Sequence, residues 1–290
     1  MPVKNVVFIG HLARNVEISY TGKHKKVFAG SAYQTSVPAA FVKTPDQMIG
    51  ILGRIGTDTL GHAIVQKLRD YGVDIDGLEI AKNEKIAWFE LTETRRNSSK
   101  RKFRGSLEAG YKIPTGIPEH YKHASYLHLA TMPPQQQLEW LVRFSSQLSP
   151  DTKFSIDTLE IYAKQFPDET LKALDSATSY VFINKEEWEI LETWGRKNRH
   201  FDALVFSVPV IRKQGAMGAR IIYPEGKSFH VSAQKINYVN GTGAGEVLAA
   251  IFLTLRAQGK DDKTALQKAV ELASLSVEDF GIDHLFKQER

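Results

Sequence analysis

The chain contains no cysteine among its 290 residues. Disulfide bonds, thiolate metal sites and a cysteine nucleophile are therefore excluded. Long apolar runs are also missing, because a stretch such as 247–255 is far shorter than the roughly 20 residues that span a bilayer. The apolar run that ends at Gly10 is too short for the core of a signal peptide. These absences favour a cytoplasmic protein with no membrane partner.

Several common catalytic motifs are absent as well. The sequence has no Gly-x-Ser-x-Gly nucleophile elbow and no His-x-x-x-His spacing, so His120 and His123 are expected to pair at the surface rather than to form a metal site. Gly226-Lys227-Ser228 looks like the end of a P-loop, but the position five residues before Gly226 is Ile221 instead of glycine. We expect that tripeptide to be a turn between strands.

The net charge of +5 arises from one short segment. Residues 95–104 contain six cations and no acid, namely Arg95, Arg96, Lys100, Arg101, Lys102 and Arg104, and without them the chain is slightly acidic. Two interpretations remain open: a solvated hairpin tip, or a patch that binds phosphate or nucleic acid.

Short apolar runs alternate with helical patterns along most of the chain. The predicted strands are 3–9, 48–55, 125–130, 154–157, 180–184 and 203–210, and the predicted helices are 134–148, 168–174, 186–194 and one from Thr57 or Asp58 to Gly72. This alternation predicts right-handed crossovers and a mostly parallel sheet covered on both faces. No repeat or Pro-rich linker marks a boundary, so we expect a single domain over residues 1–290.

Two segments do not follow this alternation of strands and helices. Residues 86–111 alternate like a hairpin that carries the basic segment at its tip, which predicts an accessory flap. Residues 215–233 are typical of two short strands around Pro224-Glu225-Gly226.

The strongest local signal is Asn240–Glu246, which we call the glycine turn. A helix follows it at once, since Val247, Ile251 and Leu255 recur on one face. The free N–H groups at a helix N-terminus bind anions, and a carboxylate at Glu246 is placed to take a proton from an attacking hydroxyl. The alternative is a structural turn that closes a helix, with an acid favoured in the first helical turn.

Several short motifs follow one another in one order. They are Gly10–Asn15, Ala29–Gln34, Gly53–Gly61 with Gly72-Val73 downstream, Asn184–Glu187, Lys213–Ala219 and the glycine turn. Together they resemble the ribokinase (PfkB) family of carbohydrate and nucleoside kinases, from about residue 3 to about residue 283.

The resemblance implies a ribokinase-like three-layer α/β/α sandwich. Its sheet would be mostly parallel with eight or nine strands, and a small β lid would come from residues of about 11–28 and 84–112. It also implies transfer of the γ-phosphate of ATP, with Mg²⁺, to an alcohol of a sugar, polyol or nucleoside. Lid strands in such folds often pair across a dimer, so a homodimer through the edge at 86–91 is an expectation.

The resemblance assigns roles residue by residue. Glu246 would be the general base, with an anion hole formed by Gly243, Ala244 and Gly245. The nucleotide and its magnesium would be held by Asn184, Glu187, Lys213, Thr242, Gly215 and Gly218, with Glu187 as the metal-organising acid. The acceptor would be bound by Asn15, Gly30, Ser31, Gln34 and Asn240.

The chain departs from the family pattern at these same positions. The family's aspartates are replaced by Asn15, Asn240 and Glu246, its loop asparagine is Gln34, and its usual threonine is Lys213. Glu246 keeps the charge but moves the carboxylate, and a displacement of about 1 Å can cost roughly a hundredfold in rate. Two functions therefore remain: an active kinase with an unusual acceptor, or a weak or inactive protein that binds a nucleotide or metabolite. Nucleic acid is not the expected partner, because the basic segment falls where the lid should be.

Overall fold

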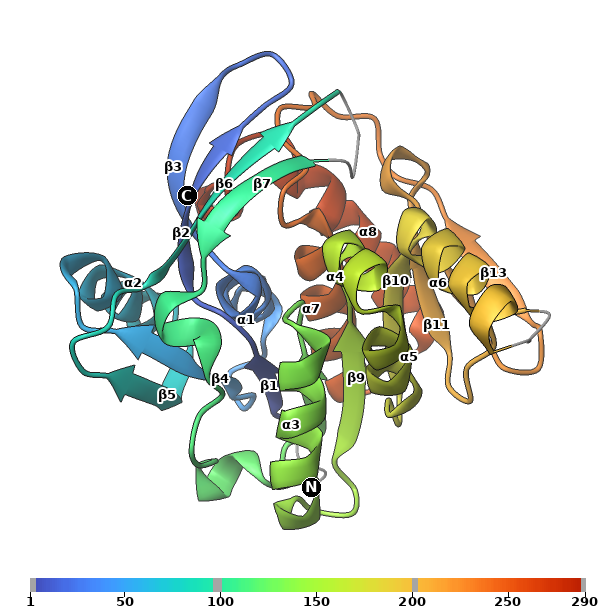
Figure 1. Ribbon diagram of the computed structural model, residues 1–290, viewed down its shortest axis with the longest axis horizontal. Coiled ribbons are helices and arrows are strands. Elements are labelled where there is room, and N and C mark those ends of the chain that lie inside the picture. The colour runs from blue at the N-terminus through green and yellow to red at the C-terminus, as the bar shows by residue number, and fades with distance from the viewer. Residues whose placement is uncertain (1–3, 96–100, 200–202, 288–290) are drawn as a thin grey trace.

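A large, mostly parallel sheet organises the computed structural model, which describes residues 4–95, 101–199 and 203–287 (Figure 1). Among these residues the sheet has nine strands in the order β13-β12-β11-β10-β9-β8-β1-β4-β5. These strands are β1 (Val6–Ile9), β4 (Ile49–Gly56), β5 (Asp74–Ala81), β8 (Tyr126–Leu129), β9 (Lys153–Asp157), β10 (Tyr180–Asn184), β11 (Val210–Lys213), β12 (Ala219–Ile222) and β13 (Ser228–Val231). The neighbours from β5 to β11 pair in parallel, and β12 and β13 add an antiparallel end.

Helices cover both faces of this sheet (Figure 1). One face carries α1 (Ser31–Val42), α2 (Thr59–Asp70), α7 (Ala244–Ala257) and α8 (Asp262–Ser276). The other carries α3 (Pro134–Phe144), α4 (Glu160–Gln165), α5 (Pro167–Asp175) and α6 (Lys185–Asn198). Strand β1 is buried on both sides as a result: Val6 and Phe8 pack in the first layer, and Val7 in the second. Among the described residues, no helix is long and apolar enough to cross a membrane.

A second, smaller sheet stands beside the first (Figure 1). In the described residues it has four strands in the order β3-β2-β6-β7, namely β2 (Ala13–Ile18), β3 (His24–Ala29), β6 (Ala87–Glu93) and β7 (Arg101–Ser106). We call this sheet the lid. Its two hairpins join through a parallel pair, in which Asn15 lies opposite Phe89. The expectation of an exposed edge at 86–91 is wrong, because β6 lies between β2 and β7 and the free edges are β3 and β7.

The expected three-layer fold with a small β lid is confirmed. Asp58 caps α2 by accepting a hydrogen bond from the Gly61 amide, and Gly72 takes the left-handed conformation with φ of 69°. The hairpin within 86–111 and the two strands within 215–233 are present as predicted, and Gly226 lies in the turn between β12 and β13. Residues 96–100, the middle of the basic segment, lie outside the described residues.

The strand predicted at 203–210 is wrong for most of its length. Strand β11 begins only at Val210, because Pro209 before it has no N–H to donate to a ladder. The apolar residues that suggested a strand belong to a loop, in which Leu204 and Phe206 are buried whereas Val205 is 71% exposed.

Candidate functional site

Several of the predicted site residues lie at the carboxyl ends of the parallel strands. Open α/β sheets bind ligands at this edge, because the loops after successive strands meet there. Strands β9, β10 and β11 end here at Asp157, Asn184 and Lys213, and the N-terminus of α7 lies in the same region.

The glycine turn is held by its own first residue. The Asn240 Oδ1 atom accepts a hydrogen bond of 2.8 Å from the Thr242 amide. Gly243 is the N-cap of α7 and has φ of 88°, a left-handed conformation that suits glycine. A Cβ at this position would lie 2.5 Å from Gln34 Nε2, so the backbone of the turn and the side chain of α1 are in close contact.

Glu246 lies in the first turn of α7. Its Oε1 atom accepts a hydrogen bond of 3.1 Å from the Thr131 hydroxyl, which comes from the loop after β8. The carboxylate is therefore oriented from outside its own helix and remains partly exposed. Sequence reasoning missed Thr131, because nothing in its local pattern distinguishes it from other loop threonines.

Lys213 forms a buried ion pair with Asp157. Its Nζ atom lies 2.6 Å from Oδ1 and 2.8 Å from Oδ2 of that aspartate. Burial raises the pKa of Asp157 to about 6 despite the lysine. Burial also acts to lower the pKa of Lys213, but the charges of Asp157, Glu187 and Glu246 outweigh it and the pKa is raised, so the ammonium stays protonated.

Asn184 and Glu187 bind each other in a reciprocal cap at the start of α6. The Glu187 amide donates to Asn184 Oδ1 at 2.9 Å, and the Asn184 amide donates to Glu187 Oε2 at 2.8 Å. The Asn184 side-chain amide also donates to Glu187 Oε1 at 2.6 Å. Burial raises the pKa of Glu187 to about 8.

The predicted acceptor residues lie where α1 begins and along the lid. Gly30, with φ of 93°, passes so close to the chain before β2 that a Cβ would lie 2.4 Å from the His11 carbonyl oxygen. Ser31 Oγ accepts a hydrogen bond from the His11 amide at 3.2 Å. Among the described residues, no group pairs with three buried amide atoms: Asn15 Oδ1, Gln34 Nε2 and Asn240 Nδ2. Such atoms cost free energy unless a ligand satisfies them.

His11 is a further residue of this region that sequence reasoning did not single out. Its ring is buried against Gly110, and within the described chain Nε2 has no partner. Burial lowers the pKa of His11 to about 4, so the ring is neutral.

The predicted nucleotide loop lies at the end of the antiparallel strands. Gly218 is buried with φ of 96°, and a Cβ there would lie 2.0 Å from the Val231 carbonyl oxygen. Gly215 is exposed at the hairpin, away from the contacts that join the other residues. An open hollow of about 430 Å³ borders this loop, lined by Gln214, Ala216, Met217, Arg220, His230 and Ser232.

The lid contacts the glycine turn through Glu93 of β6. Its Oε1 atom accepts hydrogen bonds from the Gly241 amide, at 3.0 Å, and from the Tyr238 hydroxyl. A second lid carboxylate, Glu17 Oε2, accepts from the Gly281 amide at 3.2 Å. Neither acid stood out in the sequence, although inward-facing acids on a lid strand are unusual enough to be a usable signal.

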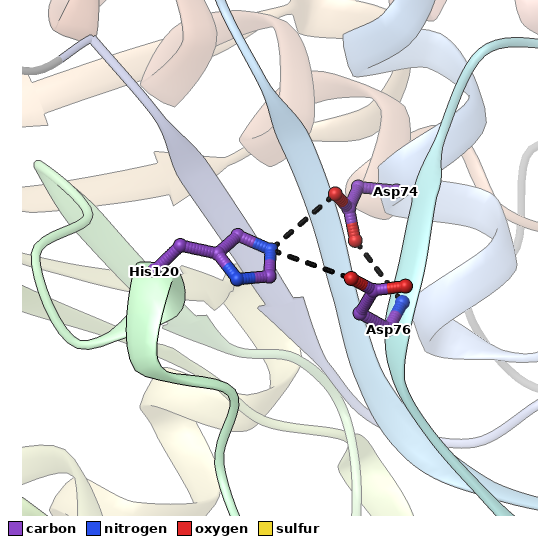
Figure 2. Close-up of side chains that lie close together, drawn as sticks. All are labelled: Asp74, Asp76 and His120. Atoms are coloured by element: carbon purple, nitrogen blue, oxygen red, sulfur yellow. Dashed lines mark hydrogen bonds and ion pairs between the residues drawn. The ribbon is translucent and has the colours of Figure 1, made fainter.

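A separate group of side chains lies at the start of β5, where His120 faces Asp74 and Asp76 (Figure 2). His120 Nε2 is 3.4 Å from Asp74 Oδ2 and 4.0 Å from Asp76 Oδ2, and three ligand-type atoms of this group lie within 4.8 Å of one another. The expected pairing of His120 with His123 is therefore replaced by an ion pair with two aspartates. Asp76 and His120 are exposed, so solvent screens this pair.

Comparison with known proteins agrees with the resemblance to the ribokinase (PfkB) family. The model of the pfkB family of carbohydrate kinases matches residues 4–288. The chain is 23% identical to a 5-dehydro-2-deoxygluconokinase from Bacillus licheniformis, over 94% of this chain and 90% of the relative. It is also 23% identical to a cytidine kinase from Thermococcus kodakarensis, over 93% and 94%. A ribokinase from Cryptococcus neoformans in complex with ADP has the same fold, with a TM-score of 0.78, 18% identity and coverage of 97% and 96%.

The order of the motifs, the carboxyl-edge site, the separate lid and the match over nearly the whole chain agree with one another. The chain therefore belongs to the pfkB family of carbohydrate kinases, which are phosphotransferases with an alcohol group as acceptor.

Proposed function

We propose that the protein transfers the γ-phosphate of ATP to an alcohol of a small sugar, polyol or nucleoside. The observation that carries this proposal is the position of Glu246, a partly exposed carboxylate in the first turn of α7, next to the backbone amides of Gly243, Ala244 and Gly245. A base and an anion hole side by side are what phosphoryl transfer to a hydroxyl needs.

Each of these groups has a role in the proposed transfer. The acceptor oxygen forms a bond with the γ-phosphorus, and the bond from that phosphorus to the β-phosphate oxygen breaks, so ADP leaves. The acceptor proton passes to the Glu246 carboxylate, which Thr131 orients through its hydrogen bond. The negative charge on the equatorial phosphate oxygens is stabilised by the amides of Gly243, Ala244 and Gly245.

The charges around the nucleotide positions suit ATP with magnesium. Three carboxyl groups, Asp157, Glu187 and Glu246, surround the ammonium of Lys213. Even with Glu187 protonated, as its raised pKa favours, two carboxylates face one ammonium, so the site can accept a divalent cation. Magnesium, when bound, would neutralise charge on the phosphate oxygens. We assign Asn184 and Glu187 to orienting its water ligands, with Lys213, Thr242, Gly215 and Gly218 along the nucleotide.

The acceptor side is assigned to the unpaired amides. Asn15, Gln34 and Asn240 present groups that a polar ligand can satisfy, with Gly30 and Ser31 forming the adjacent backbone. The two relatives above are named for a dehydrodeoxygluconate and for a nucleoside. Since both acceptors carry several hydroxyl or carbonyl groups, they suit a pocket of amide donors and acceptors. Self-association through the free lid edges β3 and β7 is part of this proposal.

A transfer screen tests the proposal. Purified protein is incubated with ATP and magnesium and with pentoses, hexoses, sugar acids, inositols or nucleosides, and ADP release is measured. We expect one of these classes to stimulate release, and Glu246→Gln to lower kcat by roughly 10²- to 10⁴-fold, the usual contribution of a general base. Glu246→Asp is the matched control, because it keeps the charge. Turnover that survives Glu246→Gln would show that this residue is not the base.

The alternative function, binding without turnover, predicts a different result of the same screen. ATP would bind, but no acceptor would stimulate ADP release. This alternative is supported by Asn15 and Asn240, which replace aspartates of the family pattern.

A further inference from the structure

Asp157 and Lys213 form the most enclosed ion pair that the structure describes at the site. Their side chains are 1% and 13% exposed, and the lysine nitrogen contacts both carboxylate oxygens. The two residues end neighbouring regions of the sheet, Asp157 at the end of β9 and Lys213 at the end of β11, with β10 between them. The ion pair therefore joins the ends of two strands that are not direct neighbours in the sheet.

The lysine head lies over the first turn of α7. A Cβ at Gly245 would be 3.3 Å from Lys213 Nζ. A helix N-terminus carries a partial positive charge, so an ammonium at this place is repelled by the helix. The nearby carboxylates offset that repulsion, and an anion between the ammonium and the helix amides would be attracted by both.

Further hydrogen bonds hold Asp157 in the position from which it contacts Lys213. Its Oδ1 atom also accepts a hydrogen bond from the Thr158 amide at 2.8 Å, and its carbonyl oxygen accepts from Gln137 Nε2, also at 2.8 Å. Both carboxylate oxygens are engaged with Lys213, so this acid is not placed to act as a second base. Its geometry is that of a support for the lysine.

We propose that Asp157 is a positioning residue, which holds the Lys213 ammonium over the first turn of α7 so that it binds the γ-phosphoryl group. This inference rests on the proposed function, and it adds a residue, Asp157, that lies outside the motifs quoted above. Without the aspartate, the long lysine side chain is free to turn away from the repelling helix end toward solvent. ADP has no γ-phosphate, so the pair should distinguish ATP from ADP.

Nucleotide titration calorimetry tests this proposal without any acceptor. The affinities for ATP and for ADP, each with magnesium, are measured for the wild type, Lys213→Met, Asp157→Asn and the double variant. We expect Lys213→Met to weaken ATP binding by about ten- to a hundredfold, the range of a charged hydrogen bond, and ADP binding by much less. Asp157→Asn should lower the preference for ATP in the same way. The double variant should lose no more affinity for ATP than Lys213→Met alone does.

Matched controls come from an exposed ion pair. Lys172 and Asp168 on α5 form a pair of 2.6 Å, and Lys172→Met or Asp168→Asn should leave both affinities unchanged. The ratio of the two affinities is measured on folded protein, so a loss of stability alone does not change it. Equal losses for ATP and ADP would overturn the proposal, as would an Asp157→Asn variant with the wild-type preference.

The proposed function fails in a different way. If the ratio shifts as expected but no acceptor stimulates ADP release in the transfer screen, the pair still binds the γ-phosphate and only the assignment of catalysis is wrong. If the wild type transfers phosphate and the ratio does not move, the role of Asp157 is wrong and the kinase assignment stands.

Discussion

Gly243 is the residue of the glycine turn with the least freedom to change. It combines a φ of 88° with close contact to Gln34. A methyl group there must both strain the backbone and displace the Gln34 amide, at a cost of roughly 1–3 kcal/mol for the strain. We expect Gly243→Ala to lower kcat/KM at least about tenfold, measured by steady-state ADP release with the acceptor found in the screen.

Gly259, just after α7, provides the control for this change. Its φ is 86°, but nothing lies within 4 Å of a Cβ built there. Gly259→Ala should therefore carry a similar backbone strain and a similar loss of thermal stability, with kcat/KM unchanged. If both variants lose activity equally, the contact with Gln34 is not what limits Gly243.

Glu187 should make stability depend on pH above neutrality. Its pKa is raised by burial to about 8, whereas an unfolded glutamate titrates near about 4.3. The folded state therefore keeps a proton that the unfolded state has released, and this stabilisation is lost as the pH rises toward 8. We expect the free energy of unfolding of the nucleotide-free protein to fall between about pH 6.5 and 8, measured by urea denaturation at several pH values.

Other buried groups act mainly below that window. His11 and His128 have pKa values lowered by burial to about 4 and about 3, so both are neutral in the folded state throughout the window. An unfolded histidine, with a pKa near about 6.5, loses its remaining proton in the lower part of the window, which raises stability slightly and so opposes the decline. Asp157, at about 6, has released most of its proton by then. In Glu187→Gln the decline between pH 6.5 and 8 should disappear. If the free energy of unfolding of that variant still fell with pH as in the wild type, the proton released in this window would belong to another group.

At the residue level, sequence reasoning proposed site residues but did not identify the groups that their side chains contact. Asn184 and Glu187 lie three apart in the chain, so their mutual hydrogen bonds follow from helix-capping rules. Asp157 and Lys213 are 56 residues apart, and their contact depends on strand order, which no local pattern encodes. An acid that ends an apolar strand run was the available signal for Asp157.

Among the elements, strand β6 links the lid to the glycine turn. Glu93 at its end accepts the hydrogen bond from the Gly241 amide. We expect Glu93→Ala to free the lid and the turn from each other, so that the acceptor KM rises and kcat falls. Hydrogen exchange of the amides in 238–243 should become faster, because opening that segment no longer breaks this bond.

Glu90 on the same strand is the matched control. It pairs with Arg104 at 3.7 Å, and its side chain is 39% exposed. Glu90→Ala should leave both the kinetic constants and the exchange of 238–243 unchanged. Equal effects of the two variants would mean that the strand itself, and not the Glu93 contact, is what the substitutions disturb.

The elements that sequence patterns predicted best are those with one clear face or clear caps. Helix α2 has both, with Asp58 at its start and Gly72 after its end. Helix α1 was not predicted, since it is buried on nearly every side, lacks an amphipathic pattern and contains Pro38. The strand predicted at 203–210 is wrong because its apolar residues belong to a loop, in which Leu204 and Phe206 are buried.

The molecule as a whole should respond to nucleotide. A ligand present at a hundred times its dissociation constant stabilises the folded state by about 2.7 kcal/mol, which for a chain of this size raises Tm by about 5 °C. We expect ATP with magnesium to produce such a shift in a thermal melt, and EDTA to remove most of it. Glu246→Gln should keep most of the shift, because the proposed base acts on the acceptor, and Asp157 and Glu187 remain at the cation site.

Failure of that shift in the wild type would argue against ATP as the phosphate donor. A shift that EDTA leaves intact would instead argue against magnesium. Neither result depends on knowing the acceptor.

Fold prediction succeeded at the scale of the whole chain because the motifs constrain one another. Each is weak alone, but their fixed order implies one sequence of strands and crossovers, and the nine-stranded sheet of the described residues has that arrangement. The acceptor is not encoded in this way, since its recognition depends on the orientations of a few side chains, for which we propose Asn15 and Gln34.

The connectivity of the lid has a consequence for how the chain folds. Its central pair, β2 and β6, is parallel, and α1, β4, α2 and β5 all lie between these strands in the sequence. Each lid hairpin alone has only two strands, which is marginal in water. The lid should therefore assemble late, after the core has brought the hairpins together, and a single proteolytic cut in either hairpin should release both.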